Sequence, residues 1–123
     1  MQPVKDIYDK IHEIQGRKVI LDDDLARLYG VKSKIVGQIV QQYPEYFQEG
    51  AVLELSEENI KQLNLPASIA EKKNGRLFTR QGISNLASLL KKEGVVRMDN
   101  EFAMRHFLIL YHMHQDYFIW SAR

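Results

Sequence analysis

The chain has 123 residues and a mass of 14.4 kDa, a length that fits one domain and leaves little room for a second core. Apolar residues make up 45% and charged residues 27%, which is typical of soluble globular proteins and argues against disorder. There is no cysteine, so disulfides, thiolate zinc sites and a cysteine nucleophile are excluded, and a reducing, cytoplasmic location is expected.

Two segments were candidates for membrane targeting, and neither has the required pattern. Charged residues interrupt residues 1–16, so this segment lacks the apolar core of a signal peptide. The longest uncharged stretch near the C-terminus, residues 107–115, is far shorter than the roughly 20 residues that span a bilayer. The sequence therefore predicts a protein with no membrane partner.

The charges are segregated along the chain. Seventeen basic and sixteen acidic residues give a net charge of +1, which by itself indicates no polyanionic partner. Residues 72–97, however, hold seven basic residues against Glu93 alone. The sequence therefore predicts one positively charged region on an otherwise acidic chain.

The N-terminal third contains signals for a helix, a strand and a second helix. Residues 6–14 place isoleucines at helical spacing, which predicts a short amphipathic helix or a loosely packed leader. Residues 17–21 form a β-branched run typical of a strand. Residues 22–24 are three aspartates that can cap and begin a helix ending at Gly30, and this explains them better than a metal site does.

A further helix is expected directly after the turn at Gly30 and Val31. Ser33 can serve as its N-cap, its apolar residues fall on one face, and it must end before Pro44. Two short helices joined by a tight turn, with apolar faces that can pack together, predict a helix-turn-helix core over residues 22–43.

The middle of the chain alternates strand and helix signals. Residues 51–55 alternate as a strand, and a helix is expected to open at Ser56 and end before Pro66. Asn74-Gly75 is a strong signal for a β-hairpin whose second strand is residues 77–78.

Two helices are expected in the last third. Thr79 can cap the first, which runs over residues 80–92, and Asp99 or Asn100 can cap the second, which extends toward Tyr117. Apolar and aromatic residues occupy more than one face of the second helix, over residues 102–120. Part of this surface is therefore expected to form an interface, and the alternative is a helix buried across the domain. The candidate interface residues are Phe107, Tyr111, Phe118 and Trp120.

Three segments together resemble the KilA-N superfamily, and specifically its ORF-six-N branch of phage antirepressor-type proteins. The first is Val19-Ile-Leu-Asp-Asp-Asp-Leu-Ala-Arg-Leu-Tyr-Gly-Val-Lys-Ser-Lys34, and the second is Tyr46-Phe47 followed by Leu53-Glu-Leu-Ser-Glu-Glu58. The third runs from Leu77-Phe-Thr-Arg-Gln-Gly-Ile83 to Met104-Arg105-x-Phe107. The resemblance covers most of the chain and implies a compact α+β DNA-binding fold with no enzymatic activity.

The sequence departs from the family pattern at two places. Where the family has basic residues and asparagine after the second helix, this chain has Gln41-Gln42-Tyr43, and Arg80 stands where glutamate is usual. The first difference removes candidate DNA contacts and the second adds a positive charge.

Residue types on the expected second helix suit a DNA major groove. Glutamine can bond adenine in a bidentate pair, and lysine can reach guanine or phosphate. A basic hairpin would add phosphate contacts, and about four of them would give a log–log salt slope of roughly −3.6. The alternative is that these residues form an ordinary solvated surface. The candidate DNA-binding residues are Lys32, Ser33, Lys34, Gln38, Gln41, Gln42, Lys72, Lys73, Arg76 and Arg80.

No motif for catalysis, metal binding or cofactor binding is present in the sequence. We therefore expect a small α+β protein with a winged helix-turn-helix core, organised as a leader helix (1–16), a core (17–97) and a C-terminal helix (98–123). Its expected function is double-stranded DNA binding in phage or mobile-element regulation, and a symmetric homodimer is one expected form. The alternative is a protein-interaction module that binds a repressor or host protein through the aromatic C-terminal helix.

Overall fold

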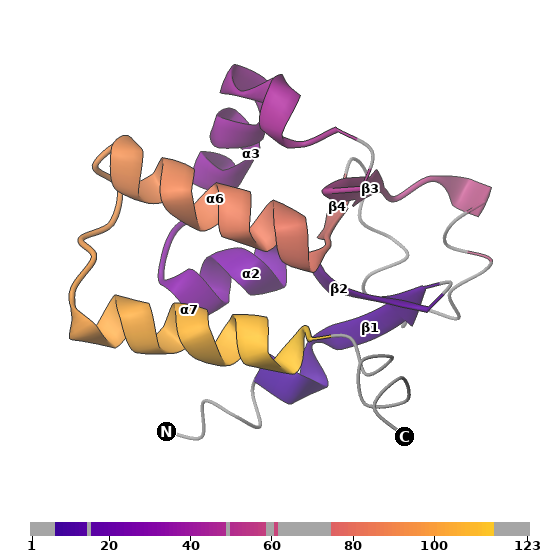
Figure 1. The fold of residues 1–123 in the computed structure, drawn as a ribbon. Helices are drawn as coiled ribbons and strands as arrows, with labels where there is room; N and C mark the ends of the chain where they lie inside the picture. The colour runs from indigo at the N-terminus through magenta and orange to yellow at the C-terminus, as the bar shows by residue number, and fades with distance from the viewer. Residues whose placement is uncertain (1–6, 15, 49, 59–60, 62–74, 115–123) are drawn as a thin grey trace.

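The computed structural model describes residues 7–14, 16–48, 50–58, 61 and 75–114. Its described strands form one four-stranded antiparallel sheet in the order β1-β2-β4-β3 (Figure 1). One face of the sheet packs through Ile20 and Phe78 against the helices and forms the main core. The other face carries a smaller apolar cluster around Val19 and Leu77. The expected α+β fold class is confirmed.

The helix expected over residues 6–14 is wrong beyond residue 9. Residues 7–9 are helical, but β1 (Ile11–Ile14) is a strand that pairs with β2 (Arg17–Leu21) across a turn where Gly16 has a φ of 79°. Spacing alone could not separate the two structures, because the isoleucines also suit a strand. Ile11 contacts the main core and Ile14 belongs to the smaller cluster on the opposite face.

The β-hairpin expected at Asn74-Gly75 is also not formed as predicted. β4 (Arg76–Phe78) pairs on one edge with β2 and on the other with β3 (Val52–Glu54). A strand has only two hydrogen-bonding edges, and β2 and β3 occupy both edges of β4. No edge is therefore left for a hairpin partner directly before Asn74. The expected strands at 17–21, 51–55 and 77–78 are themselves confirmed, with small differences at their ends.

The two helices that follow β2 are confirmed, with α2 at Asp22–Tyr29 and α3 at Ser33–Gln42. Gly30 has a φ of 71°, and the N–H groups of Gly30 and Val31 donate to the last carbonyls of α2. Glycine adopts this left-handed conformation without steric cost, so α2 ends here and the chain turns at once into α3.

The expected side-chain caps of these two helices are wrong. The N-cap positions are Leu21 and Lys32, and neither makes a side-chain cap hydrogen bond. Asp22 instead accepts hydrogen bonds from the backbone N–H of Asp23 at 2.8 Å and of Arg76 at 3.2 Å. The first aspartate therefore ties α2 to β4 at the point where β2 runs directly into the helix.

Thr79 caps α6 (Arg80–Lys92) as expected, and its side chain accepts from the Gly82 N–H. Its hydroxyl also lies 2.7 Å from the Gly50 carbonyl oxygen and 3.0 Å from that of Ala51, so it links the start of α6 to the chain before β3. The expected buried stripe of α6 is confirmed in full, as Ile83, Leu86, Ala87 and Leu90 are all buried.

Asp99 caps α7 (Asn100–His112), accepting from the Phe102 N–H at 2.9 Å. The helix ends at His112 and does not extend to Tyr117. Lys18 of β2 donates to the His112 carbonyl at 3.4 Å and to that of His114 at 3.0 Å, so a side chain from the sheet satisfies the helix end. The helix expected after Ser56 is helical at residues 57, 58 and 61, and its remainder lies outside the described residues.

A buried tyrosine joins α2 to α7. Tyr29 stacks on Phe102 with ring centroids 5.1 Å apart, and its hydroxyl lies 2.6 Å from Nδ1 of His106. Burial raises the pKa of Tyr29, so the hydroxyl remains the donor. Burial and the nearby charge of Arg80 lower the pKa of His106, so its neutral ring accepts the hydrogen bond from Tyr29. The two helices are therefore held together by a bond that requires neutral histidine.

This bond predicts a pH-dependent contribution to stability. Because the folded pKa of His106 is lower than its unfolded value, His106 contributes stability that is complete above about pH 6.5 and decreases as the pH falls toward the folded pKa. In His106→Gln, which keeps an acceptor for Tyr29 but does not titrate, the difference in Tm between about pH 7.5 and pH 5 should be smaller than in the wild type. His114→Gln, at an exposed position, is the control. An equal pH effect in wild type and His106→Gln would contradict this prediction.

Candidate nucleic-acid interface

The outward side of α3 carries a polar stripe. Val36 and Ile39 are buried in the main core, which fixes the rotation of the helix. Lys34, Gln38 and Gln41 lie at i, i+4 and i+7 on the opposite side and are all exposed. We call these three residues the outer stripe of α3. Their amides and ammonium are therefore directed to solvent, away from the body of the protein.

The N-terminus of α3 adds a local positive field. Lys32 and Ser33 are exposed, and the first turn contains no acidic residue. Backbone N–H groups at a helix start favour anions, and two lysines in the same turn strengthen that preference. This end of α3 is consequently suited to contact a phosphate.

Gln42 does not share the outer stripe. Its amide donates to Oε1 of Glu93 at 3.0 Å, and the Tyr43 hydroxyl donates to the same oxygen. Lys92 lies 5.4 Å from the centre of the Tyr43 ring. These contacts hold the end of α3 against the end of α6, so Gln42 has a structural contact that the sequence did not indicate.

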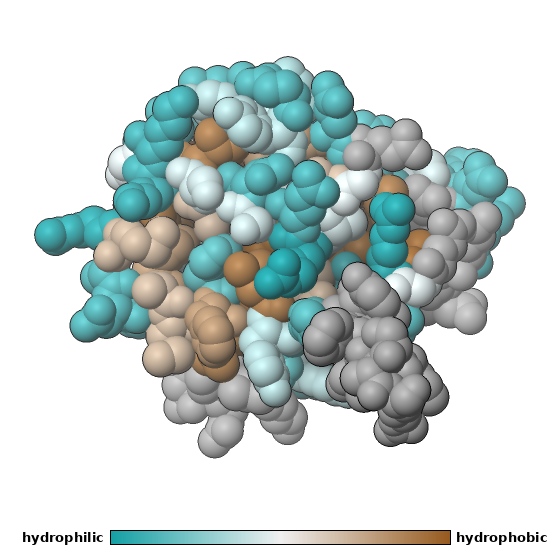
Figure 2. Space-filling model, viewed as in Figure 1, coloured by the Kyte–Doolittle hydropathy of each residue, from teal (hydrophilic) through white to brown (hydrophobic). Residues whose placement is uncertain are grey.

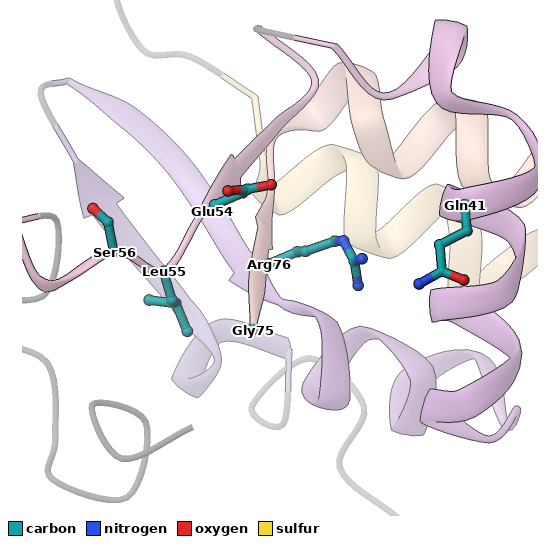
Figure 3. Close-up of a pocket in the computed structure, with 6 residues that line it drawn as sticks. All are labelled: Gln41, Glu54, Leu55, Ser56, Gly75 and Arg76. Atoms are coloured by element: carbon teal, nitrogen blue, oxygen red, sulfur yellow. The ribbon is translucent and has the colours of Figure 1, made fainter. Parts of the chain in front are cut away.

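A groove separates α3 from the edge of the sheet. It has a volume of about 410 Å³, and Figure 3 shows Arg76 reaching from β4 toward Gln41 of α3. A neighbouring hollow of about 460 Å³ shares Gln41, Glu54 and Arg76 with it. We call the first the α3–β4 groove, and its lining residues are Gln41, Glu54, Leu55, Ser56, Gly75 and Arg76.

The guanidinium of Arg76 lies beside α3 at a glycine. A Cβ atom at Gly37 would lie 3.9 Å from Nη1 of Arg76, an ordinary contact distance, so the guanidinium lies against this part of α3. Sequence reasoning placed Arg76 on a hairpin and did not identify Glu54 as its neighbour. The cross-strand register sets Glu54 opposite Arg76, and no local signal in the sequence indicates that pairing.

The remaining expected basic residues do not gather at this groove. Arg80 is exposed at the start of α6 and does not line this groove, and its charge helps to lower the pKa of His106 in α7. Lys72 and Lys73 lie outside the described residues. Of the predicted basic hairpin, Arg76 alone is placed next to α3 by the part of the chain that the structure describes.

Apolar side chains are exposed on α7. Met104, Phe107 and Tyr111 have exposed fractions of 59%, 62% and 65%, and the last two rings are stacked with centroids 6.3 Å apart. Figure 2 shows tan and brown residues over the part of this face where Figure 1 draws α7. Two of the four expected interface residues are therefore exposed on one helix, while Phe118 and Trp120 lie outside the described residues.

The described residues contain no group of three or more histidine, cysteine, aspartate or glutamate residues that could hold a metal ion. No helix among them is long and apolar enough to cross a membrane.

The comparisons with known proteins identify the family. The model of the ORF6N domain matches residues 9–89, a range that contains the described sheet, α2, α3 and all but the end of α6. The chain therefore belongs to the ORF6N domain family, which indicates a phage-associated regulatory protein. Searches of curated proteins and of solved structures found no match.

Proposed function

We propose that this protein binds double-stranded DNA through α3, as a regulatory protein of phage or mobile-element origin with an antirepressor-like role. The observation that carries the proposal is the exposed outer stripe of α3 next to the guanidinium of Arg76. Membership of the ORF6N family supports it. No reaction chemistry or cofactor is part of the proposal.

The residue types of the stripe fit a division of roles in a major groove. Gln38 and Gln41 can each bond N6 and N7 of adenine, while Lys34 reaches guanine or phosphate. Lys32 and Ser33 at the helix start hold a phosphate and so fix the position of the helix. Lys72, Lys73 and Arg80 remain candidates for further phosphate contacts.

A homodimer would extend the same arrangement to two half-sites. Dimeric helix-turn-helix proteins place their two helices in major grooves about 34–36 Å apart, one turn of the duplex. We expect a palindromic site of that spacing if the protein binds as a symmetric dimer.

The test is a mobility shift on random duplex at low salt, followed by a salt titration. The wild type should shift the duplex with a log–log slope of roughly −3.6 if about four phosphates are contacted. Lys72→Glu with Lys73→Glu and Arg76→Glu should weaken the shift and make the slope shallower. If the wild type shifts no duplex, the proposal is wrong and the interaction module becomes the better account.

A protein-interaction surface on α7 is the second candidate function, and the exposed Met104, Phe107 and Tyr111 favour it. Three large apolar side chains on one helix face are unusual on a surface that only faces water. A second copy of the chain is the first partner to test, with a repressor or host protein as the alternative.

Light scattering at micromolar concentration tests the second copy. The wild type should be a dimer, and Phe107→Ser with Tyr111→Ser should be a monomer with the same helical circular dichroism. Tyr46→Ser, which removes an exposed ring in the turn after α3, is the control and should leave the dimer intact. A monomeric wild type would exclude dimerisation through this face.

A further inference from the structure

We infer that Arg76 is a specificity-determining residue that recognises a guanine base in the bound duplex, rather than one more phosphate contact. This inference rests on the proposed DNA-binding function and assigns to a strand residue a part in base recognition beside α3. Three observations carry it: the anchored backbone of Arg76, the direction of its side chain along α3 beside Gln41, and the absence of an ion pair to Arg76 among the described residues.

The backbone of Arg76 is held firmly. Its N–H donates to the Asp22 carboxylate at 3.2 Å, and Glu54 lies opposite it in the strand register. The next residue, Leu77, is completely buried. The side chain therefore starts from a fixed point, as a residue must if it is to distinguish one base from another.

The side chain of Arg76 is directed along α3. Figure 3 shows it extending from β4 toward Gln41, and its Nη1 lies 3.9 Å from the Cβ position of Gly37. The guanidinium thus stands beside the outer stripe of α3 at the level of Gln41, where base edges would lie if α3 entered a major groove.

The guanidinium is available to a ligand. Among the described residues no ion pair to Arg76 is formed, although Glu54 lies directly across the strand. The side chain is half-buried and lines the α3–β4 groove of about 410 Å³. An arginine in that position presents several N–H donors in a fixed fork.

The position beside Gln41 decides between phosphate and base. Arg76 and Gln41 line the same groove, so the guanidinium would reach a base edge next to the one that Gln41 binds. Guanine presents O6 and N7 as two acceptors in the major groove, the pair that the arginine fork matches.

The experiment selects bound sequences from a random duplex pool with the wild type and with Arg76→Lys, which keeps the charge but loses the fork. The wild-type site should contain a guanine position next to the adenines bound by α3. On defined duplexes, Arg76→Lys should reduce the preference for guanine at that position by about 5- to 150-fold, with an unchanged salt slope. The Tm of both proteins verifies that the variant is folded.

A measurement on the wild type alone makes the test independent of the folding of the variant. Replacing the selected guanine by 7-deazaguanine removes the N7 acceptor and should weaken binding about fivefold or more. If Arg76→Lys weakened binding equally on every duplex, Arg76 would be a phosphate contact and the inference alone would be overturned. Unchanged guanine preference in Arg76→Lys would also overturn it alone. A wild type that binds no duplex would overturn the proposed function together with this inference.

Discussion

Gly82→Ala should destabilise the fold more than any other glycine-to-alanine change in the described residues. A Cβ atom at Gly82 would lie 2.1 Å from the Ala51 carbonyl oxygen and 2.9 Å from its carbonyl carbon. That oxygen already accepts from the Thr79 N–H at 3.0 Å, so it cannot move away without breaking that hydrogen bond. We expect the free energy of unfolding to fall by about 1–3 kcal/mol, even though alanine favours helix more than glycine does.

Gly37→Ala is the matched control, because it is the same substitution inside another helix. The nearest atom to its Cβ position is Nη1 of Arg76 at 3.9 Å, an ordinary contact distance. The free energy of unfolding should therefore rise by about 0.5–1 kcal/mol through helix propensity alone. Urea titration of both variants gives the comparison. If Gly82→Ala is as stable as Gly37→Ala, the close approach of α6 to Ala51 is incorrect.

The part of the fold that the sequence predicted is the part defined by local signals. The helix over residues 22–29 ends where Gly30 must turn, and α3 ends before Pro44. Thr79 was predicted as a cap, and Asp99 was one of two candidates with Asn100, because each precedes a helical pattern. Thr79 and Asp99 both accept the cap hydrogen bond. Each of these signals acts over a few residues, so a sequence without coordinates is sufficient to locate them.

Two of the errors concern contacts between distant residues. The pairing of Leu21 with Leu77 makes β4 a central strand, and that pairing rather than Asn74-Gly75 decides which strands lie beside it. The end of α7 is set by Lys18, which is far away in the chain. Local patterns contain no information on which strand edge or which helix end such a residue will meet.

The candidate site likewise combines residues that local patterns predicted with residues whose positions depend on distant contacts. Periodicity alone placed Lys34, Gln38 and Gln41 outward, since Val36 and Ile39 had to face the core. The placement of Gln42 against α6 could not be predicted, because it depends on the position of another helix. The charge count grouped Arg76 with Arg80. In the fold, the Arg76 guanidinium lies beside α3, whereas the charge of Arg80 acts on His106 of α7.

Lys32→Glu combined with Lys34→Glu should reduce DNA binding by at least about 100-fold at 0.1 M salt, if α3 is the DNA-contacting helix. Both lysines are exposed at the start of the helix. Loss of two phosphate contacts reduces the magnitude of the salt slope by about 1.8 and lowers the binding constant roughly 60-fold at that salt concentration. The introduced carboxylates add repulsion from the phosphates of the DNA backbone.

The control must change the net charge equally without altering α3. Arg17→Glu with Lys91→Glu does so, because both residues are exposed and neither lines the α3–β4 groove. Long-range repulsion should weaken binding in this control only slightly, and screening by salt should remove the effect, since a Debye length is about 10 Å at 0.1 M. Equal losses in the two variants would mean that the net charge of the protein, and not the N-terminus of α3, governs binding. A loss confined to the α3 variant would locate the phosphate contacts at the helix start, because only there do the exposed backbone N–H groups and the two lysines act on the same phosphate.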